Sequence, residues 1–230
     1  MVNALAWVST IPTAFSGPSR RPVSDSRLRG LYAITDENLI SESAFAKTVE
    51  QALQGGAAII QYRDKSSDDT KRRQQAALLR ALCSQYAATL IINDDLTLAK
   101  TVAADGVHLG ENDATISEAR MLLGDTRLIG VSCYNQLQRA LAAQSAGADY
   151  VAFGAIFDSP TKQAARSASC ALITAAKSQL SIPVCAIGGI DTSNVAKVIG
   201  AGADMAAMIS ALWNADDIKH TSELIARLFH

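Results

Sequence analysis

The sequence of 230 residues is poor in cysteine, and its four cysteines lie far apart. Cys83, Cys133, Cys170 and Cys185 form no C-x-x-C pair. This spacing argues against a zinc site built from paired cysteines and against a disulfide framework. We therefore expect reduced thiols and a cytoplasmic protein.

An excess of basic residues is also missing. The chain has 21 Lys and Arg against 22 Asp and Glu, a net charge of −1. Proteins that bind nucleic acid non-specifically usually carry a basic excess, so we expect no nucleic-acid partner. No uninterrupted apolar run reaches the roughly 18 residues of a membrane helix, so we expect no membrane partner either. The chain is 49% hydrophobic, which is enough to bury a sizeable core.

Residues 1–28 differ in composition from the rest. They contain Pro12, Pro18 and Pro22, many serines and an Arg20-Arg21 pair. No basic residue precedes their apolar part, unlike in a secretory signal. We predict an irregular N-terminal extension, or a start codon placed too early, with organelle targeting as the alternative. The remainder, 29–230, is predicted to be a single domain.

Short apolar runs alternate along that domain with longer segments of helical spacing. Residues 68–86 place Ala76, Leu79 and Cys83 on one face, and Asp68 supplies negative charge at the helix start. The same spacing predicts helices over 135–146 and over 193–200, the second capped by Thr192 or Ser193. The predicted strands are 30–35, 57–62, 89–93, 106–109, 128–132, 149–154, 183–187 and 204–208.

Eight strand signals, each followed by a helix signal, indicate an α/β fold with a parallel sheet. The junctions "GGAA", "ADGV", "GADY" and "GADM" precede strands, and in each we expect a glycine to end the preceding helix in the left-handed conformation. Eight units in about 200 residues is the size of a closed barrel. We predict a (β/α)8 TIM barrel. A doubly wound open sheet is the alternative, although no G-x-G-x-x-G follows the first strand.

Polar residues are concentrated after the predicted strands. In a barrel all eight carboxyl ends meet at one rim, where active sites are built. The opposite strand ends carry mostly glycine, alanine, proline and aspartate. The rim residues are Thr35, Asp36, Gln61, Arg63, Lys65, Asn93, Asp94, Asp95, His108, Glu111, Asp113, Ser132, Ser159, Thr161, Lys162, Gly188, Gly189 and Ser210.

These residue types fit a diphosphate bridged by Mg²⁺. Arg63, Lys65 and Lys162 are cationic donors, and arginine can hold a phosphate through two parallel bonds. Asp94 and Asp113 are hard oxygen ligands, of which Mg²⁺ typically takes one or two from the protein. A helix-capping or salt-bridge role is the alternative for either aspartate alone.

A second anion site is predicted after the last two strands. Gly188 and Gly189 allow close backbone approach, and Ser210 follows the eighth strand. Barrels frequently hold a phosphate in these two loops. Two subsites imply two phosphorylated groups without saying which.

Several segments together resemble the thiamine phosphate synthase family over about 30–230. Individually each motif is weak, but they occur in the family's order and spacing. They are "QYRDK" (61–65), "INDD" (92–95), "GVHLGENDA" (106–114), "GVS" (130–132), "SPTK" (159–162), "IGGI" (187–190) and "IS" (209–210).

The resemblance implies a (β/α)8 barrel that joins a pyrimidine diphosphate to a thiazole phosphate with Mg²⁺, releasing pyrophosphate. Asp94 and Asp113 would hold the metal, and Arg63, Ser132 and Lys162 would act in catalysis. The implied contacts to the pyrimidine diphosphate are Gln61, Tyr62, Arg63, Asp64, Lys65, Asn93, Ser132 and Lys162. The implied contacts to the thiazole phosphate are Ser159, Pro160, Thr161, Gly188, Gly189, Ile209 and Ser210.

Two departures and several alternatives accompany the resemblance. Glu111 stands where the family usually has glutamine, and Ser159 where it commonly has threonine. A relative that only isomerises the thiazole phosphate, another phosphosugar-type isomerase, and a sensor of thiamine precursors are the rival functions. His108 is expected to be a packing residue and Trp213 an anchor. The sequence leaves room for a homo-oligomer.

Overall fold

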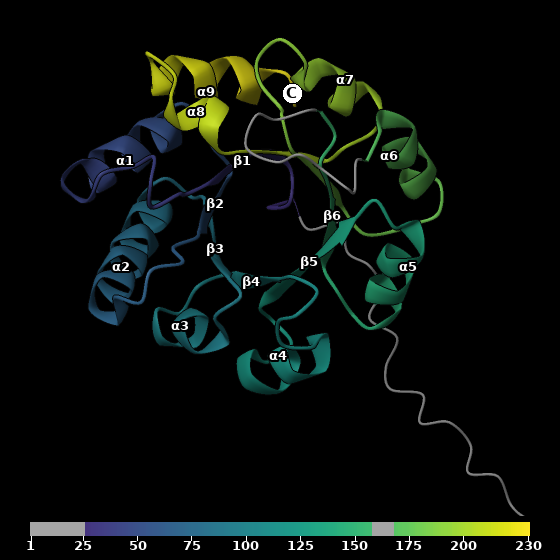
Figure 1. Cartoon of the computed structure of the whole chain (residues 1–230), viewed down its shortest axis with the longest axis horizontal. Coiled ribbons are helices and arrows are strands. Elements are labelled where there is room, and N and C mark those ends of the chain that lie inside the picture. The colour runs from purple at the N-terminus through teal and green to yellow at the C-terminus, as the bar shows by residue number, and fades with distance from the viewer. Residues whose placement is uncertain (1–25, 158–167) are drawn as a thin grey trace, which may run out of the picture.

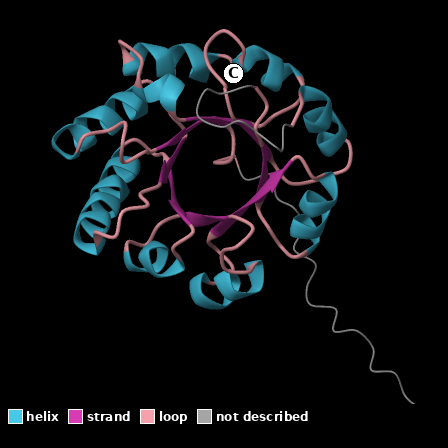
Figure 2. Ribbon diagram, in the orientation of Figure 1, coloured by secondary structure: helices cyan, strands magenta, loops and turns pink. Residues whose placement is uncertain are grey.

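The computed structural model describes residues 26–157 and 168–230. Within them, eight parallel strands close into a barrel in which each strand pairs with its sequence neighbours and β1 pairs with β8. Helices surround this ring (Figures 1 and 2). The predicted (β/α)8 TIM barrel is confirmed. The strands are β1 (Gly30–Ile34), β2 (Ile59–Tyr62), β3 (Thr89–Asn93), β4 (Gly106–Leu109), β5 (Leu128–Tyr134), β6 (Tyr150–Phe153), β7 (Val184–Ile187) and β8 (Met205–Met208).

The helical elements lie in the connections that follow the strands. Asp68 accepts a bond from the backbone N–H of Lys71 at the start of the second helix, and Ala76, Leu79 and Cys83 are fully buried as expected. The elements are η1 (Glu42–Ala44), α1 (Phe45–Gln54), α2 (Asp69–Gln85), α3 (Leu96–Thr101), α4 (Ile116–Leu123), α5 (Leu137–Ser145), α6 (Cys170–Lys177), α7 (Val195–Gly200), α8 (Ser210–Trp213) and α9 (Ile218–Arg227).

Two local expectations were wrong. Helix α7 starts after Asn194, which makes no side-chain cap, and Ser193 instead donates to the Asp191 carboxylate. At the "ADGV" junction the left-handed residue is Ala103, directly before the motif, at φ 52°, because Gly106 already lies in β4. At the junctions before β2, β6 and β8 a glycine does take this conformation.

Alternation along the strands divides the core into two parts. The inward set, which includes Ile59, Ile91 and Met205, fills the barrel lumen. The outward set packs against the helices, as Ile60 and Leu90 do. Polar side chains also enter the lumen, at positions that run from Tyr150 at the start of β6 to Gln61 near the end of β2. Sequence alternation therefore determines which strand residues can reach a site at the rim.

The opposite, amino-terminal end is held by a repeated contact that we call the amino-end latch. An aspartate just before an even-numbered strand accepts a bond from the backbone N–H of the first or second residue of the preceding strand and pairs with a cation from a helix. Such bonds to a charged group are stronger than neutral ones. The three copies are Asp105 with Leu90 N (2.7 Å) and Arg80 (2.6 Å), Asp149 with Ile129 N (2.7 Å) and Arg120, and Asp204 with Val184 N (2.7 Å) and Lys177 (2.7 Å).

Long-range contacts also join the two ends of the described chain. Leu28 is buried in the lumen cluster, and Arg29 donates to the Phe229 carbonyl at 2.7 Å. The indole of Trp213 donates to the Ile34 carbonyl at 2.6 Å, so this residue is the expected anchor. All four cysteines are unpaired. In the ranges 26–157 and 168–230, no helix is both long and apolar enough to cross a membrane.

Candidate active site

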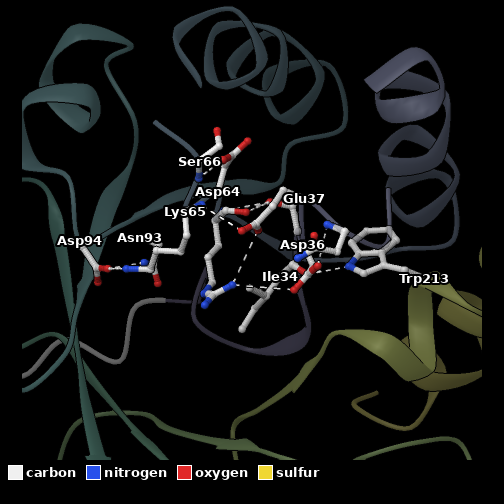
Figure 3. A network of polar contacts seen from close by, with 12 residues as sticks. Ile34, Asp36, Glu37, Asp64, Lys65, Ser66, Asn93, Asp94 and Trp213 are labelled. Carbon is white, nitrogen blue, oxygen red and sulfur yellow. Dashed lines mark hydrogen bonds and ion pairs between the residues drawn. The ribbon is translucent and has the colours of Figure 1, made fainter. Parts of the chain in front are cut away.

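The ends of β2 and β3 bring oppositely charged side chains together at the rim. Lys65 Nζ lies 2.5 Å from Asp94 Oδ2, and Asn93 Nδ2 donates to the same oxygen at 2.6 Å. These side chains line a pocket of about 250 Å³ that also includes Asp95 and Arg72. Figure 3 shows the contributing segments of three neighbouring strands, with Asp36 and Glu37 after β1, Asp64, Lys65 and Ser66 after β2, and Asn93 and Asp94 at the end of β3.

Asp94 and Asp113 come from different loops and lie near each other at the rim. Burial raises the pKa of Asp94 above its usual value, the bond from Lys65 opposes this, and the nearby Asp113 carboxylate adds to it. Asp113 Oδ2 also accepts a bond from the Gly110 N–H at 2.7 Å, which fixes its side chain on the loop after β4. Two carboxylates that approach each other from separate loops form a set of hard oxygen donors suited to Mg²⁺. Among the residues described, no group of three or more metal-ligating side chains occurs.

Residues that directly follow β1 orient the Arg63 side chain and its backbone. Arg63 Nη1 lies 3.8 Å from the Asp36 carboxylate and 3.9 Å from that of Glu37. Thr35 Oγ1 accepts from the Arg63 N–H at 2.8 Å and donates to the Arg63 carbonyl at 3.1 Å, which fixes the backbone where the loop leaves β2. About a third of the Arg63 side chain is exposed, so its remaining donors can reach an anion at the rim.

Two members of "QYRDK" do not face the rim with their side chains. Tyr62 points outward, packs edge-on against Phe45 and donates to Gln75 Oε1 at 3.1 Å. This follows from alternation, because Gln61 points into the lumen. Asp64 lies 2.7 Å from Lys71 Nζ and accepts from the Ser66 N–H. Burial alone would raise the pKa of Asp64, but the bonds from Lys71 and Ser66 lower it below its usual value. Both residues shape the loop.

Gln61 and Ser132 end a buried series of hydrogen bonds across the lumen. Gln61 Nε2 donates to Tyr32 OH at 2.7 Å, and Tyr32 OH lies 2.8 Å from Tyr150 OH. Tyr150 OH is 3.0 Å from His108 Nδ1, and His108 Nε2 is 2.9 Å from Ser132 Oγ. Burial lowers the pKa of His108 to about 4, so this side chain is neutral at physiological pH. His108 therefore packs in the lumen, as expected, and also makes two specific polar contacts.

The loops after β7 and β8 provide the second group of predicted residues. Gly188 and Gly189 both have positive φ, at 102° and 63°. A side chain at Gly188 would lie 2.6 Å from the Ala155 backbone, so only glycine fits where this loop meets the one after β6. Ser210 begins the short helix α8, with Ile209 as its N-cap. The predicted residues Ser159, Pro160, Thr161 and Lys162 lie outside the described residues.

Arg139 is a site-supporting residue that the sequence analysis did not identify. It donates from Nε to the Ser132 carbonyl at 2.8 Å, and its guanidinium lies over the Tyr134 ring. Its Nη1 is 4.0 Å from Glu111 Oε1. Arg139 thus connects the loop after β4 to the end of β5. The Glu111 carboxylate on that loop lies beside the Arg139 guanidinium. The helical position of Arg139 carried no sequence signal for this role.

Comparison with known proteins agrees with this geometry. The family model described as thiamine monophosphate synthase matches residues 31–212. The chain belongs to the thiamine monophosphate synthase family. Thiamine-phosphate synthases of Thiobacillus denitrificans and Thioalkalivibrio sulfidiphilus are 51% and 49% identical to it, over 87% and 88% of this chain and 94% and 96% of theirs.

A solved structure supports the same assignment. Thiamine phosphate pyrophosphorylase from Pyrococcus furiosus superposes with a TM-score of 0.80 at 34% identity, covering 88% of this chain and 96% of that one. A 3-hexulose-6-phosphate synthase, at 17% identity and a TM-score of 0.64, shares the fold alone. The predicted family and the predicted activity, that of a thiamine phosphate synthase acting as a transferase, are confirmed.

Proposed function

We propose that this enzyme couples 4-amino-2-methyl-5-hydroxymethylpyrimidine diphosphate to 4-methyl-5-(2-phosphoethyl)thiazole, forming thiamine phosphate and pyrophosphate. The observation that carries the proposal is the meeting of Asp94, Asp113 and Lys65 at one rim, beside Arg63. A departing diphosphate needs concentrated positive charge, which Lys65, Arg63 and a metal held by the two aspartates would provide together.

Asp94 and Asp113 are the residues that would hold Mg²⁺, because they are the interacting pair of hard oxygen donors at this rim. A bound Mg²⁺ would neutralise charge on the leaving pyrophosphate. Lys65 already pairs with Asp94, so its ammonium lies where it can pass from that carboxylate to a phosphate oxygen. Asn93 donates to the same Asp94 oxygen and helps to fix that carboxylate.

The chain's other residues bind and orient the two substrates. Arg63 can grip the diphosphate through two parallel bonds, and Ser132 can donate a further bond. Gly188, Gly189, Ile209 and Ser210 would hold the thiazole phosphate at the second subsite. Once both are held, the thiazole nitrogen attacks the methylene carbon as its bond to the pyrophosphate oxygen breaks. Orientation and electrostatic stabilisation account for the rate, without a covalent nucleophile.

The remaining expectations belong to the same proposal. Ser159, Pro160 and Thr161 would complete the thiazole phosphate site, and Lys162 the diphosphate site. The four unpaired cysteines support a reducing compartment such as the cytoplasm. Two expectations stay predictions. One is the division into an N-terminal extension, 1–28, and a barrel domain, 29–230. The other is a homo-oligomer.

The experiment that tests the proposal is a coupling assay with both precursors. We expect Asp94→Ala to abolish Mg²⁺-dependent pyrophosphate release while leaving the fold intact by circular dichroism. A pure thiazole isomerase would form no thiamine phosphate, and a sensor would bind the precursors without turnover. Thiamine phosphate formation at an unchanged rate in Asp94→Ala would refute the metal assignment.

A further inference from the structure

A series of five hydrogen-bonded side chains crosses the barrel lumen, and the direction in which its members donate follows from their chemistry. We call this series the lumen chain. It comes from five strands, and its three inner members are nearly inaccessible to solvent. Its links measure 2.7, 2.8, 3.0 and 2.9 Å, and in order it consists of Gln61, Tyr32, Tyr150, His108 and Ser132.

The direction is set at the Gln61 end. An amide nitrogen only donates, so Tyr32 OH accepts from Gln61. The Tyr32 proton then needs an acceptor, and Tyr150 OH is the one within hydrogen-bonding distance in the described structure. Tyr150 in turn must donate to His108 Nδ1, which leaves the ring proton on Nε2. His108 Nε2–H therefore donates to Ser132 Oγ.

The opposite direction leaves a buried proton without a partner. If Ser132 donated to His108, Nδ1–H would donate to Tyr150, and Tyr150 to Tyr32. Tyr32 would then accept two bonds, one from Tyr150 and one from Gln61. Its own hydroxyl proton would have no acceptor among these partners. An unsatisfied buried hydroxyl costs on the order of 1–3 kcal/mol, which is enough to select the first direction.

We propose that Tyr32, Tyr150 and His108 are positioning residues that fix the Ser132 hydroxyl as an outward-pointing hydrogen-bond donor. Because Ser132 Oγ accepts from His108, its own proton is directed away from the lumen, toward an acceptor at the rim. This inference rests on the proposed function in one respect, the assignment of a pyrophosphate oxygen as that acceptor. The chain transfers no proton, and burial raises the pKa of both tyrosines so that they remain donors.

The first test reads the histidine tautomer directly and needs no catalysis. In the full-length protein labelled with ¹⁵N-histidine, we expect a protonated Nε2 and an unprotonated, hydrogen-bonded Nδ1 for His108 at neutral pH. The spectrum of His108→Gln identifies its signals among those of the three histidines in the chain. A protonated Nδ1 with an unprotonated Nε2 would overturn the proposal.

The second test reverses the chain from its far end. Gln61→Glu is nearly isosteric, but an ionised carboxylate can only accept, so Tyr32 must donate to it. Each link then reverses, and the proton on His108 should move from Nε2 to Nδ1. The spectrum is recorded at a pH where the ¹³C signal of the introduced carboxyl group shows it to be ionised. An unchanged tautomer under that condition would contradict the proposal.

A matched control comes from the outer layer. Gln75→Glu also introduces a buried carboxylate, but Gln75 lies on helix α2 and accepts from Tyr62, whose side chain lies outside the lumen. We expect this variant to leave the His108 tautomer unchanged. A shift as large as that of Gln61→Glu would show a general charge effect and would overturn the chain mechanism.

A double-mutant cycle then connects the chain to catalysis. Tyr150→Phe should lower kcat by about 10-fold, the scale of one hydrogen bond to a charged group. In a Ser132→Ala background the same change should alter kcat by less than about twofold, because Tyr150 acts through Ser132. Equal losses in both backgrounds would contradict the positioning role. If the parent protein turns over neither precursor, the proposed function fails, while the tautomer results still decide the direction.

Discussion

Lys65 Nζ lies 2.5 Å from Asp94 Oδ2, so a cation from the chain itself occupies one of the two carboxylates assigned to the metal. The Lys65 side chain is about half exposed, which leaves it free to move away. In the proposed cycle Lys65 exchanges this carboxylate for a phosphate oxygen as Mg²⁺ and the diphosphate bind. Lysine suits such an exchange because its ammonium is a point charge on a flexible stem.

This pairing predicts opposite effects on metal binding and on turnover. Lys65→Met removes a competing charge, so Mg²⁺ should bind the substrate-free protein several-fold more tightly, while coupling falls by about 10-fold or more. Calorimetric titration and the coupling assay measure the two effects. Lys71→Met, which removes the partner of Asp64 instead, is the control and should leave Mg²⁺ affinity unchanged. Weaker Mg²⁺ binding in Lys65→Met would contradict the exchange.

Asp94 after β3 and the two acidic residues after β4, Glu111 and Asp113, are predicted to differ in function. Asp94→Asn and Asp113→Asn should each lower kcat/KM by about 100-fold or more, because Mg²⁺ loses a charged ligand. Glu111→Gln is the matched control, since Glu111 lies near Arg139. We expect it to change kcat/KM by less than about threefold at saturating Mg²⁺. A loss in Glu111→Gln equal to that in Asp113→Asn would place Glu111 among the ligands.

The amino-end latch predicts a change in stability without a change in chemistry. Asp149→Asn weakens the bond to the Ile129 N–H and leaves Arg120 without its carboxylate, so the free energy of unfolding should fall by about 2 kcal/mol. Asp216→Asn, at an exposed position, should stay within about 0.5 kcal/mol of the parent. Urea denaturation measures both. Because the latch lies at the end opposite the rim, a selective loss of kcat in Asp149→Asn would be inconsistent with this role.

His108 predicts how stability depends on pH. Its ordinary pKa is 6.5, and burial lowers it to about 4 in the folded protein. Below pH 6.5 the unfolded chain takes up a proton that the folded protein does not. The free energy of unfolding should therefore fall as the pH drops from about 6.5 to about 4, by roughly 3 kcal/mol in total from this group.

The comparison is with His108→Gln, in which this dependence should flatten between about pH 6.5 and 5.5, above most of the range in which carboxylates titrate. Chemical denaturation at a series of pH values provides the measurement. An identical slope in the parent and the variant would show that His108 titrates normally in the folded state.

Much of this architecture could be predicted because barrel strands follow strict rules. Buried parallel strands appear as short apolar runs, and all eight expected strands exist within two residues of their predicted limits. The closed topology then forces their carboxyl ends together, so Lys65 and Asp94 could be assigned to one rim although 29 positions separate them. Their contact confirms that step.

The remaining features depend on side-chain direction and on partners from distant segments. Strand alternation, applied to "IIQYRDK", would have turned Tyr62 outward, but the motif as a whole suggested a substrate contact. The pairing of Asp64 with Lys71 depends on how the loop folds back onto α2. Tyr32 and Tyr150 look like ordinary core residues in the sequence, and only their spacing in three dimensions reveals the lumen chain.

The most direct test of the account measures pyrophosphate and thiamine phosphate together, with both precursors, in Mg²⁺ and in excess chelator. We predict equal amounts of the two products in Mg²⁺, and a loss of both in chelator that added Mg²⁺ reverses. Equal product formation in chelator, or pyrophosphate released without thiamine phosphate, would contradict the coupling reaction assigned to this rim.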